Sequence, residues 1–198
     1  MKTLVITLLV AMLPVAALAV IDPDPDLLGI YFDTQADENC LQVDSGVTFN
    51  AYVILTNTSQ DGIEAFEFSY ENEYDSDYSG MFVMLGQTLP PHAINVGSGD
   101  SSSGSIQTGL AVPLYSESAM VLVTWQYLVL NSFPVMMYLG PAGIPSLDEG
   151  LPVVQNSNHE LISVGVIGGN VNRSVAAVNG VCGAEVEMHW GTVKSQFR

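Results

Sequence analysis

Basic residues are nearly absent from this sequence. It holds four lysines and arginines against 21 aspartates and glutamates, a formal net charge of −17 at pH 7, and no basic residue lies between Lys2 and Arg173. Nucleic acids and anionic lipids are bound mainly through Lys and Arg contacts to phosphate, so this composition excludes both as partners. The acidity favours solubility in a salty or calcium-rich exterior, and a cation site or a basic partner is the alternative.

Catalytic motifs are absent too. The chain has no G-x-S-x-G or H-E-x-x-H motif, and none of its three histidines has a second His or Cys at metal-ligand spacing. With so many carboxylates, a pair suited to glycoside hydrolysis arises by chance. The Ser- and Gly-rich segment 97–104 predicts a flexible loop and not a phosphate-binding one, because no basic residue or following helix supports it. We expect no catalytic residue and no enzyme activity.

Long apolar runs are few, and none predicts a membrane span in the mature protein. Residues 1–19 are typical of a secretory signal, with Lys2, an apolar core and a small-residue cleavage site, so we expect a mature chain from Val20 that is secreted or held in the cell envelope. The apolar stretch 119–139 is interrupted by polar residues and Pro134 into pieces too short to span a membrane. We interpret it as two buried strands.

Cysteine is rare. Cys40 and Cys182 lie near opposite ends of a chain that we expect in an oxidising compartment, where paired thiols usually form a disulfide. Closing a loop of this length contributes up to about 5 kcal/mol in the chain-entropy model. We predict that the two are bonded, and two unrelated thiols are the alternative.

Alternating hydrophobicity is the main positive signal. Apolar residues recur at every second position of 47–55, and the segment 66–71 alternates aromatic with acidic or polar side chains. This period of two is typical of strands with one face on a core. Further apolar segments are separated by Gly, Pro, Ser and Asn turns, and no long helical period is found, so the pattern predicts an all-β sandwich or barrel. About 179 mature residues suit one domain.

The segment 44–71 resembles the early strands of cohesin domains. It runs through a turn with Gly46, a long alternating strand, the pair Gly62-Ile63 and an aromatic strand ending at Tyr70. Cohesins are similar in this order but end the aromatic strand in Tyr-Asp, where Glu71 stands here. The likeness covers roughly residues 27–171, because later stretches fit the same frame: 104–112, 121–130 and 161–169.

The resemblance implies a jelly-roll-like antiparallel β-sandwich of about nine strands over residues 20–172. It implies a non-catalytic module that recognises a protein partner, in cohesins a dockerin, through a sheet face. Related carbohydrate-binding sandwiches share much of the pattern, and they use exposed aromatic faces, for which Tyr74 and Tyr78 are candidates. The partner is therefore an extracellular protein or a polysaccharide, and a structural envelope protein is a third alternative.

An acidic turn is the candidate metal site, and calcium is the candidate ion. The segment 75–80 copies the first half of a calcium loop, with oxygen ligands at alternate positions and Gly at the sixth. The second half does not follow, because Gly86 stands where a bidentate carboxylate is needed. An exposed acidic turn is therefore the favoured interpretation. The candidate ligands are Glu71, Glu73, Asp75 and Asp77.

Residues 173–198 form a tail whose end is basic where the body is acidic. Three apolar side chains near its end would share one face of a short helix, with two cations spaced i, i+4 beside them. We interpret this segment as a partner-binding or sorting tail, and docking on its own domain is the alternative. Its residues are Trp190, Val193, Lys194, Phe197 and Arg198.

Overall fold

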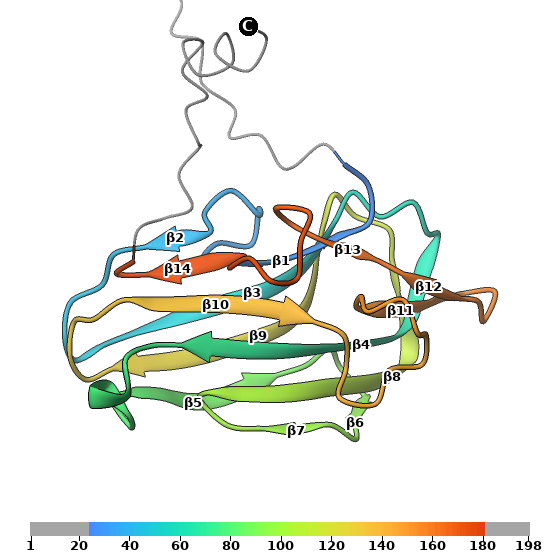
Figure 1. Ribbon diagram of the computed structural model, residues 1–198. Coiled ribbons are helices and arrows are strands. Elements are labelled where there is room, and N and C mark those ends of the chain that lie inside the picture. The colour runs from blue at the N-terminus through green and yellow to red at the C-terminus, as the bar shows by residue number, and fades with distance from the viewer. Residues whose placement is uncertain (1–23, 181–198) are drawn as a thin grey trace, which may run out of the picture.

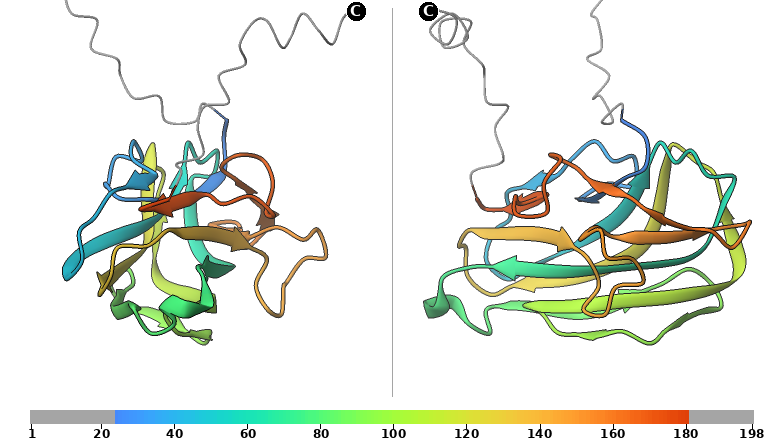
Figure 2. Two further views of the ribbon diagram at one scale, coloured as in Figure 1. Left: turned by 60° about the vertical axis from the view of Figure 1, so that its left-hand side comes forward. Right: turned by 45° about the vertical axis from the view of Figure 1, so that its right-hand side comes forward.

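The computed structural model describes residues 24–180, which form strands and a single short 3-10 helix, η1 (Ser76–Tyr78) (Figure 1). Turn residues separate the strands, as the sequence predicts. No helix in this part of the chain combines the length and the apolar character needed to cross a membrane. The strands assemble into two sheets that pack face to face as two layers (Figure 2).

The first sheet has five strands in the order β13-β1-β3-β9-β5. Its long central pair, β3 and β9, is antiparallel, whereas β1 and β13 are parallel. The strands are β1 (Leu27–Tyr31), β3 (Val47–Thr56), β5 (Phe82–Thr88), β9 (Ala119–Val129) and β13 (Gly165–Val166).

The second sheet is built around one long strand, β4 (Gly62–Glu73). One edge of β4 pairs with β8 (Ser103–Tyr115) along almost its whole length. The other edge pairs with β10 near its end and with β11 near its start. The remaining strands of this sheet are β2 (Cys40–Leu41), β6 (Ala93–Asn95), β7 (Ser98–Gly99), β10 (Val135–Gly140), β11 (Val153–Asn156), β12 (Leu161–Ser163) and β14 (Ala176–Val178).

The predicted fold class, an all-β sandwich, is confirmed. Of the fourteen strands in the described residues, six have only two or three residues, and the longer ones form the sandwich. The stretch 119–139 divides into β9 and β10, as the polar interruptions predict. Strand β14 pairs with β10 and β2, so the sheet includes residues beyond 172, where the sequence places the start of the tail.

Aromatic side chains fill the space between the sheets. Trp125 and Tyr127 of β9 are fully buried, and the Tyr127 ring stacks on Phe82 with 4.5 Å between centroids. From the facing sheet, Tyr70 approaches Trp125 with 4.7 Å between centroids. Fully burying a large apolar side chain contributes roughly 1.5–3 kcal/mol, so this cluster is a main source of stability.

The segment 97–104 closes one side of this core. It contains β7 and is held by side chains of β4: the Tyr70 hydroxyl donates to the Asp100 carbonyl at 2.8 Å, and Asn72 Nδ2 donates to the Ser101 carbonyl at 2.8 Å. Its backbone is also tied through Asn72 N, which donates to the Ser102 carbonyl. The segment expected to be a flexible loop is therefore a hydrogen-bonded cover over buried aromatic rings.

Candidate functional site

The alternation of β4 decides which of its side chains face solvent. Phe66, Phe68, Tyr70 and Asn72 point into the core, so the intervening Glu67, Glu71 and Glu73 lie on the outer face of the second sheet. We call these three residues the carboxylate row.

The carboxylate row has little positive charge to balance it. The Tyr138 hydroxyl of the neighbouring strand donates to Glu73 Oε2 at 2.8 Å, and this hydrogen bond raises the pKa of Tyr138, with smaller contributions from burial and nearby carboxylates. Between residues 24 and 180, Arg173 is the only lysine or arginine. The outer face of this sheet is therefore strongly negative.

A groove opens on the same outer face, beside the carboxylate row. It is a cavity of about 310 Å³ that crosses β8, β4, β11 and β12, and its main lining residues are Ala65, Glu67, Val96, Gln107, Gly109 and Leu161. Ala65 and Gly109 are paired across the two central strands, and a side chain added at Gly109 would meet nothing within 4 Å. Because both residues at this paired position are small, no long side chain fills the space above the sheet there, and the groove is open.

The chain after β10 forms one border of the groove. Ser146 donates to the Glu67 carboxylate through its backbone N–H at 2.5 Å and through its hydroxyl at 2.9 Å. Gln107 Nε2 donates to the carbonyl of Ile144 at 2.9 Å, and the Ile144 side chain is 81% exposed. Glu67 therefore holds the segment 141–152 against the sheet.

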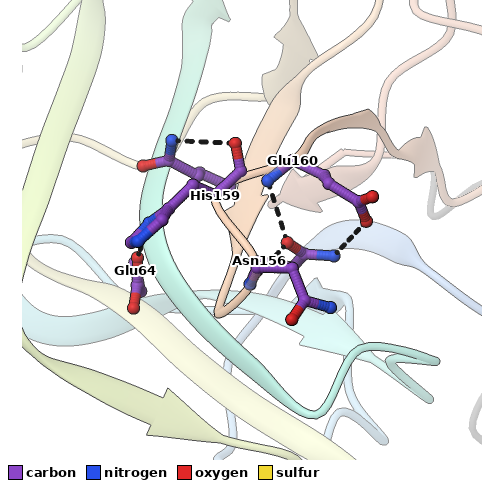
Figure 3. A network of polar contacts seen from close by, with 6 residues as sticks. Glu64, Asn156, His159 and Glu160 are labelled. Carbon is purple, nitrogen blue, oxygen red and sulfur yellow. Dashed lines mark hydrogen bonds and ion pairs between the residues drawn. The ribbon is translucent and has the colours of Figure 1, made fainter.

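The hairpin between β11 and β12 forms the opposite border, and a polar network fixes its shape (Figure 3). The buried Asn156 accepts from the Glu160 N–H at 3.0 Å and donates to Glu160 Oε2 at 3.1 Å. His159 Nδ1 lies 2.7 Å from Glu64 Oε2 on β4. These contacts tie the hairpin to the sheet and place Leu161 at the edge of the groove.

The groove offers mainly apolar side chains with a single carboxylate. Among its lining residues Glu67 is the only titratable one, so the groove holds no pair of acid and base. Strongly raised pKa values occur instead in the core: burial raises the pKa of Tyr70 to about 12, with a smaller contribution from Asp100, and burial also raises the pKa of Tyr127. An apolar hollow beside carboxylates suits a partner that offers apolar and cationic side chains.

The four candidate calcium ligands are not brought together. Glu71 and Glu73 point outward from β4, whereas Asp75 accepts from the Asp77 N–H at 3.0 Å and caps η1. Across residues 24–180, no group of three or more His, Cys, Asp and Glu could hold a metal ion. The calcium site remains a prediction, and calorimetric titration with calcium tests it.

Three other sequence predictions fall wholly or partly outside the described residues. The signal sequence, the tail segment 190–198 and Cys182 lie outside them, and all remain predictions. Cys40 begins β2, which runs parallel to β14, and Gln42 Nε2 donates to the Gly180 carbonyl. The described chain thus ends close to the strand that carries Cys40.

The groove residues were missed by sequence reasoning. The alternation of β4 predicts which of its side chains face outward, but nothing local indicates that Ala65 and Gly109 are neighbours. Their pairing is the last step of a regular β4-β8 register that runs from Glu71 and Ser103 to Ala65 and Gly109, and the ladder becomes irregular just beyond it, between Ile63 and Ala65. The only sequence signal for the hollow is that two strands that are neighbours in the sheet, β4 and β8, each carry a small outward-facing residue.

Comparisons with known proteins identify the fold. No family model matches the chain, and no curated protein matches it. A type II cohesin domain from the cellulosome of Acetivibrio cellulolyticus is similar, with a TM-score of 0.53 and 12% identity over 79% of this chain and 96% of that chain.

Two solved complexes contain similar chains. One is the sixth cohesin of scaffoldin B from Acetivibrio cellulolyticus with a dockerin, at a TM-score of 0.51 and 11% identity over 77% of this chain and 96% of that chain. The other is a type I cohesin-dockerin complex from Clostridium thermocellum, at 0.52 and 9% identity over 77% and 97%. The chain therefore has a cohesin-like β-sandwich fold, as the early strands predict.

Proposed function

We propose that this protein is a secreted, non-catalytic module that binds an extracellular protein partner, of dockerin type or another, through the outer face of its second sheet. The observation that carries the proposal is the groove between β8, β4 and the β11-β12 hairpin, open to solvent and bordered by the carboxylate row. Two chains of similar fold occur in complexes with dockerins, which supports a protein partner.

The expected location follows from the sequence. The predicted signal at residues 1–19 supports export, and a similar solved domain comes from a cellulosome. The shortage of lysine and arginine counts against nucleic acid as a partner.

The carbohydrate alternative has less support from the described residues. Tyr74 and Tyr78, the candidate platform residues, pack on Phe133 with 5.8 and 4.4 Å between ring centroids, and Tyr78 stacks flat on it. Rings used in this way offer less free face to a sugar.

A capture experiment tests the proposal. The purified chain is immobilised and exposed to a panel of recombinant dockerin modules, and separately mixed with insoluble cellulose. Saturable binding of a dockerin with no depletion by cellulose is the expected result. Depletion by cellulose with no dockerin bound would favour the carbohydrate alternative.

A further inference from the structure

Exposed apolar side chains gather around the groove. Val96 is 77% exposed, Ile144 is 81% exposed and Leu161 is 45% exposed, although they come from three separate parts of the chain. Val96 and Leu161 line the groove, and Ile144 is held beside it through the Gln107 side chain. Apolar side chains grouped in this way, with polar groups at their rim, mark an interaction surface.

The negative charge of this surface favours a positively charged binding partner. The carboxylate row lies on the same face, and the single basic residue between positions 24 and 180 is Arg173. Carboxylates on one face repel each other and attract a positively charged segment. A complementary segment therefore combines large apolar side chains with lysine or arginine.

The chain itself carries such a segment in residues 190–198. It holds two large aromatic side chains, Trp190 and Phe197, together with Val193 at helical spacing. It also holds Lys194 and Arg198, the only basic residues after Arg173. Its composition complements both the groove and the carboxylate row.

The described chain ends on the same face of the sheet. Asn179 has a φ of 53°, which turns the backbone after β14. A Cβ added at Gly180 would lie 3.1 Å from Met136 Sδ and 3.3 Å from the Ala177 Cβ. Met136 pairs with Ala177 on one side and with Glu73 on the other, so Gly180 lies over the outer face, one strand away from the carboxylate row.

The chain after Gly180 is long enough for residues 190–198 to reach the groove of the same molecule. Along β4, Glu73 and Ala65 are eight residues apart, which corresponds to roughly 27 Å. The ten residues from Gly180 to Trp190 extend to at most about 33–36 Å. A second copy of the chain is not required to deliver the segment.

We propose that residues 190–198 dock on the outer face of the second sheet of their own molecule. The apolar side chains of the segment lie in the groove, and Lys194 and Arg198 face the carboxylate row. The inference concerns the same face as the proposed function but does not depend on it. It adds an internal occupant that an external partner must displace.

Zero-length cross-linking tests this docking, because Lys194 is the only lysine after Lys2. The full chain is treated with a water-soluble carbodiimide, which joins an amine to a carboxylate in direct contact, and the products are mapped by peptide mass spectrometry. The expected result is that Lys194 is joined mainly to Glu67, Glu71 or Glu73. Products spread over carboxylates of both sheets, or no product from Lys194, would overturn the proposal.

Variants and labelling separate the alternatives. Trp190→Ala and Phe197→Ala are expected to lower the yield from Lys194 at least fivefold, while Met188→Ala, outside the segment, leaves it unchanged. In a mixture of ¹⁵N-labelled and unlabelled protein, cross-links are expected within one copy, and mixed products would assign the segment to a second copy and overturn docking on the same molecule. Dockerin capture without these cross-links would leave the proposed function standing and remove this inference.

Discussion

Tyr70 links the core to the cover formed by residues 97–104. Its hydroxyl is buried and donates to the Asp100 carbonyl, and burial, followed by the Asp100 charge, raises its pKa from 10.0 to about 12. The folded protein therefore keeps the phenolic proton over a pH range in which the unfolded chain loses it. The stability that depends on this proton is fully present below about pH 10 and is lost as the pH rises to about 12.

We expect the free energy of unfolding to fall between pH 10 and pH 12, and Tyr70→Phe to remove part of that fall. Urea unfolding of both proteins at a series of alkaline pH values measures it. The raised pKa of Tyr127 leaves a remaining slope in the variant. Identical pH dependence in the two proteins would count against the assignment.

Two glycines of β8 offer a matched pair. A Cβ at Gly104 would lie 2.6 Å from the Gly99 Cα and 2.7 Å from Tyr70 Cε1, whereas one at Gly109 would meet nothing within 4 Å. Gly104→Ala should lower the free energy of unfolding by about 1–3 kcal/mol through overpacking. Gly109→Ala should change it by no more than about 0.5 kcal/mol. Equal effects in urea unfolding would contradict this packing.

Residue-level sequence reasoning succeeded where a local period decides the outcome. The alternation of Phe66, Phe68 and Tyr70 with acidic or polar neighbours predicts which side chains enter the core, and the structure places them there. The hollow at Ala65 and Gly109 could not be predicted, because it depends on the register between two strands that are distant in sequence.

The segment 141–152 is held on the second sheet by side chains of β4 and β8, and Glu67 contributes two of these contacts. Glu67 accepts both hydrogen bonds from Ser146. Glu67→Ala should therefore increase backbone hydrogen exchange of this segment about tenfold, since local opening follows the loss of such contacts. Glu71→Ala, on the same face of β4, is the control and should leave the exchange unchanged. Equal protection in both variants would show that Glu67 does not anchor the segment.

Cys40, one of the two cysteines of the predicted disulfide, lies in β2, which pairs with β14. If Cys40 is bonded to Cys182, reduction should lower the free energy of unfolding by about 2–5 kcal/mol. Unfolding with and without reductant measures the loss, and non-reducing peptide mapping identifies the linked peptides. Free thiols at both positions would remove the disulfide from the account.

Element-level prediction worked for the long strands and missed the three-residue strand β14. The period of two marked β3 over the bounds that the structure shows, and polar interruptions separated β9 from β10. The three-residue β14 is too short to carry a pattern, and its parallel pairing with β2 joins residues far apart in the chain. Long-range pairing of this kind is set by the whole sandwich, which a local pattern does not describe.

At the scale of the whole molecule, negative and positive charges are separated along the sequence. The carboxylate row and the groove share one face of the sandwich, and the cations that follow residue 173 are near the end of the chain. Composition alone predicted the acidity and its effect on the choice of partner. It could not predict that the carboxylate row lies beside a hollow on one sheet, because that requires the fold.

Calorimetric titration of paired variants with a captured dockerin tests the central claim most directly. Gly109→Leu fills the open floor of the groove, and Gln126→Leu places the same side chain at an exposed position of β9 on the other sheet. Binding through the outer face of the second sheet predicts that Gly109→Leu weakens affinity at least tenfold, while Gln126→Leu leaves it unchanged. Unchanged affinity in Gly109→Leu, with a loss in Gln126→Leu, would contradict the account.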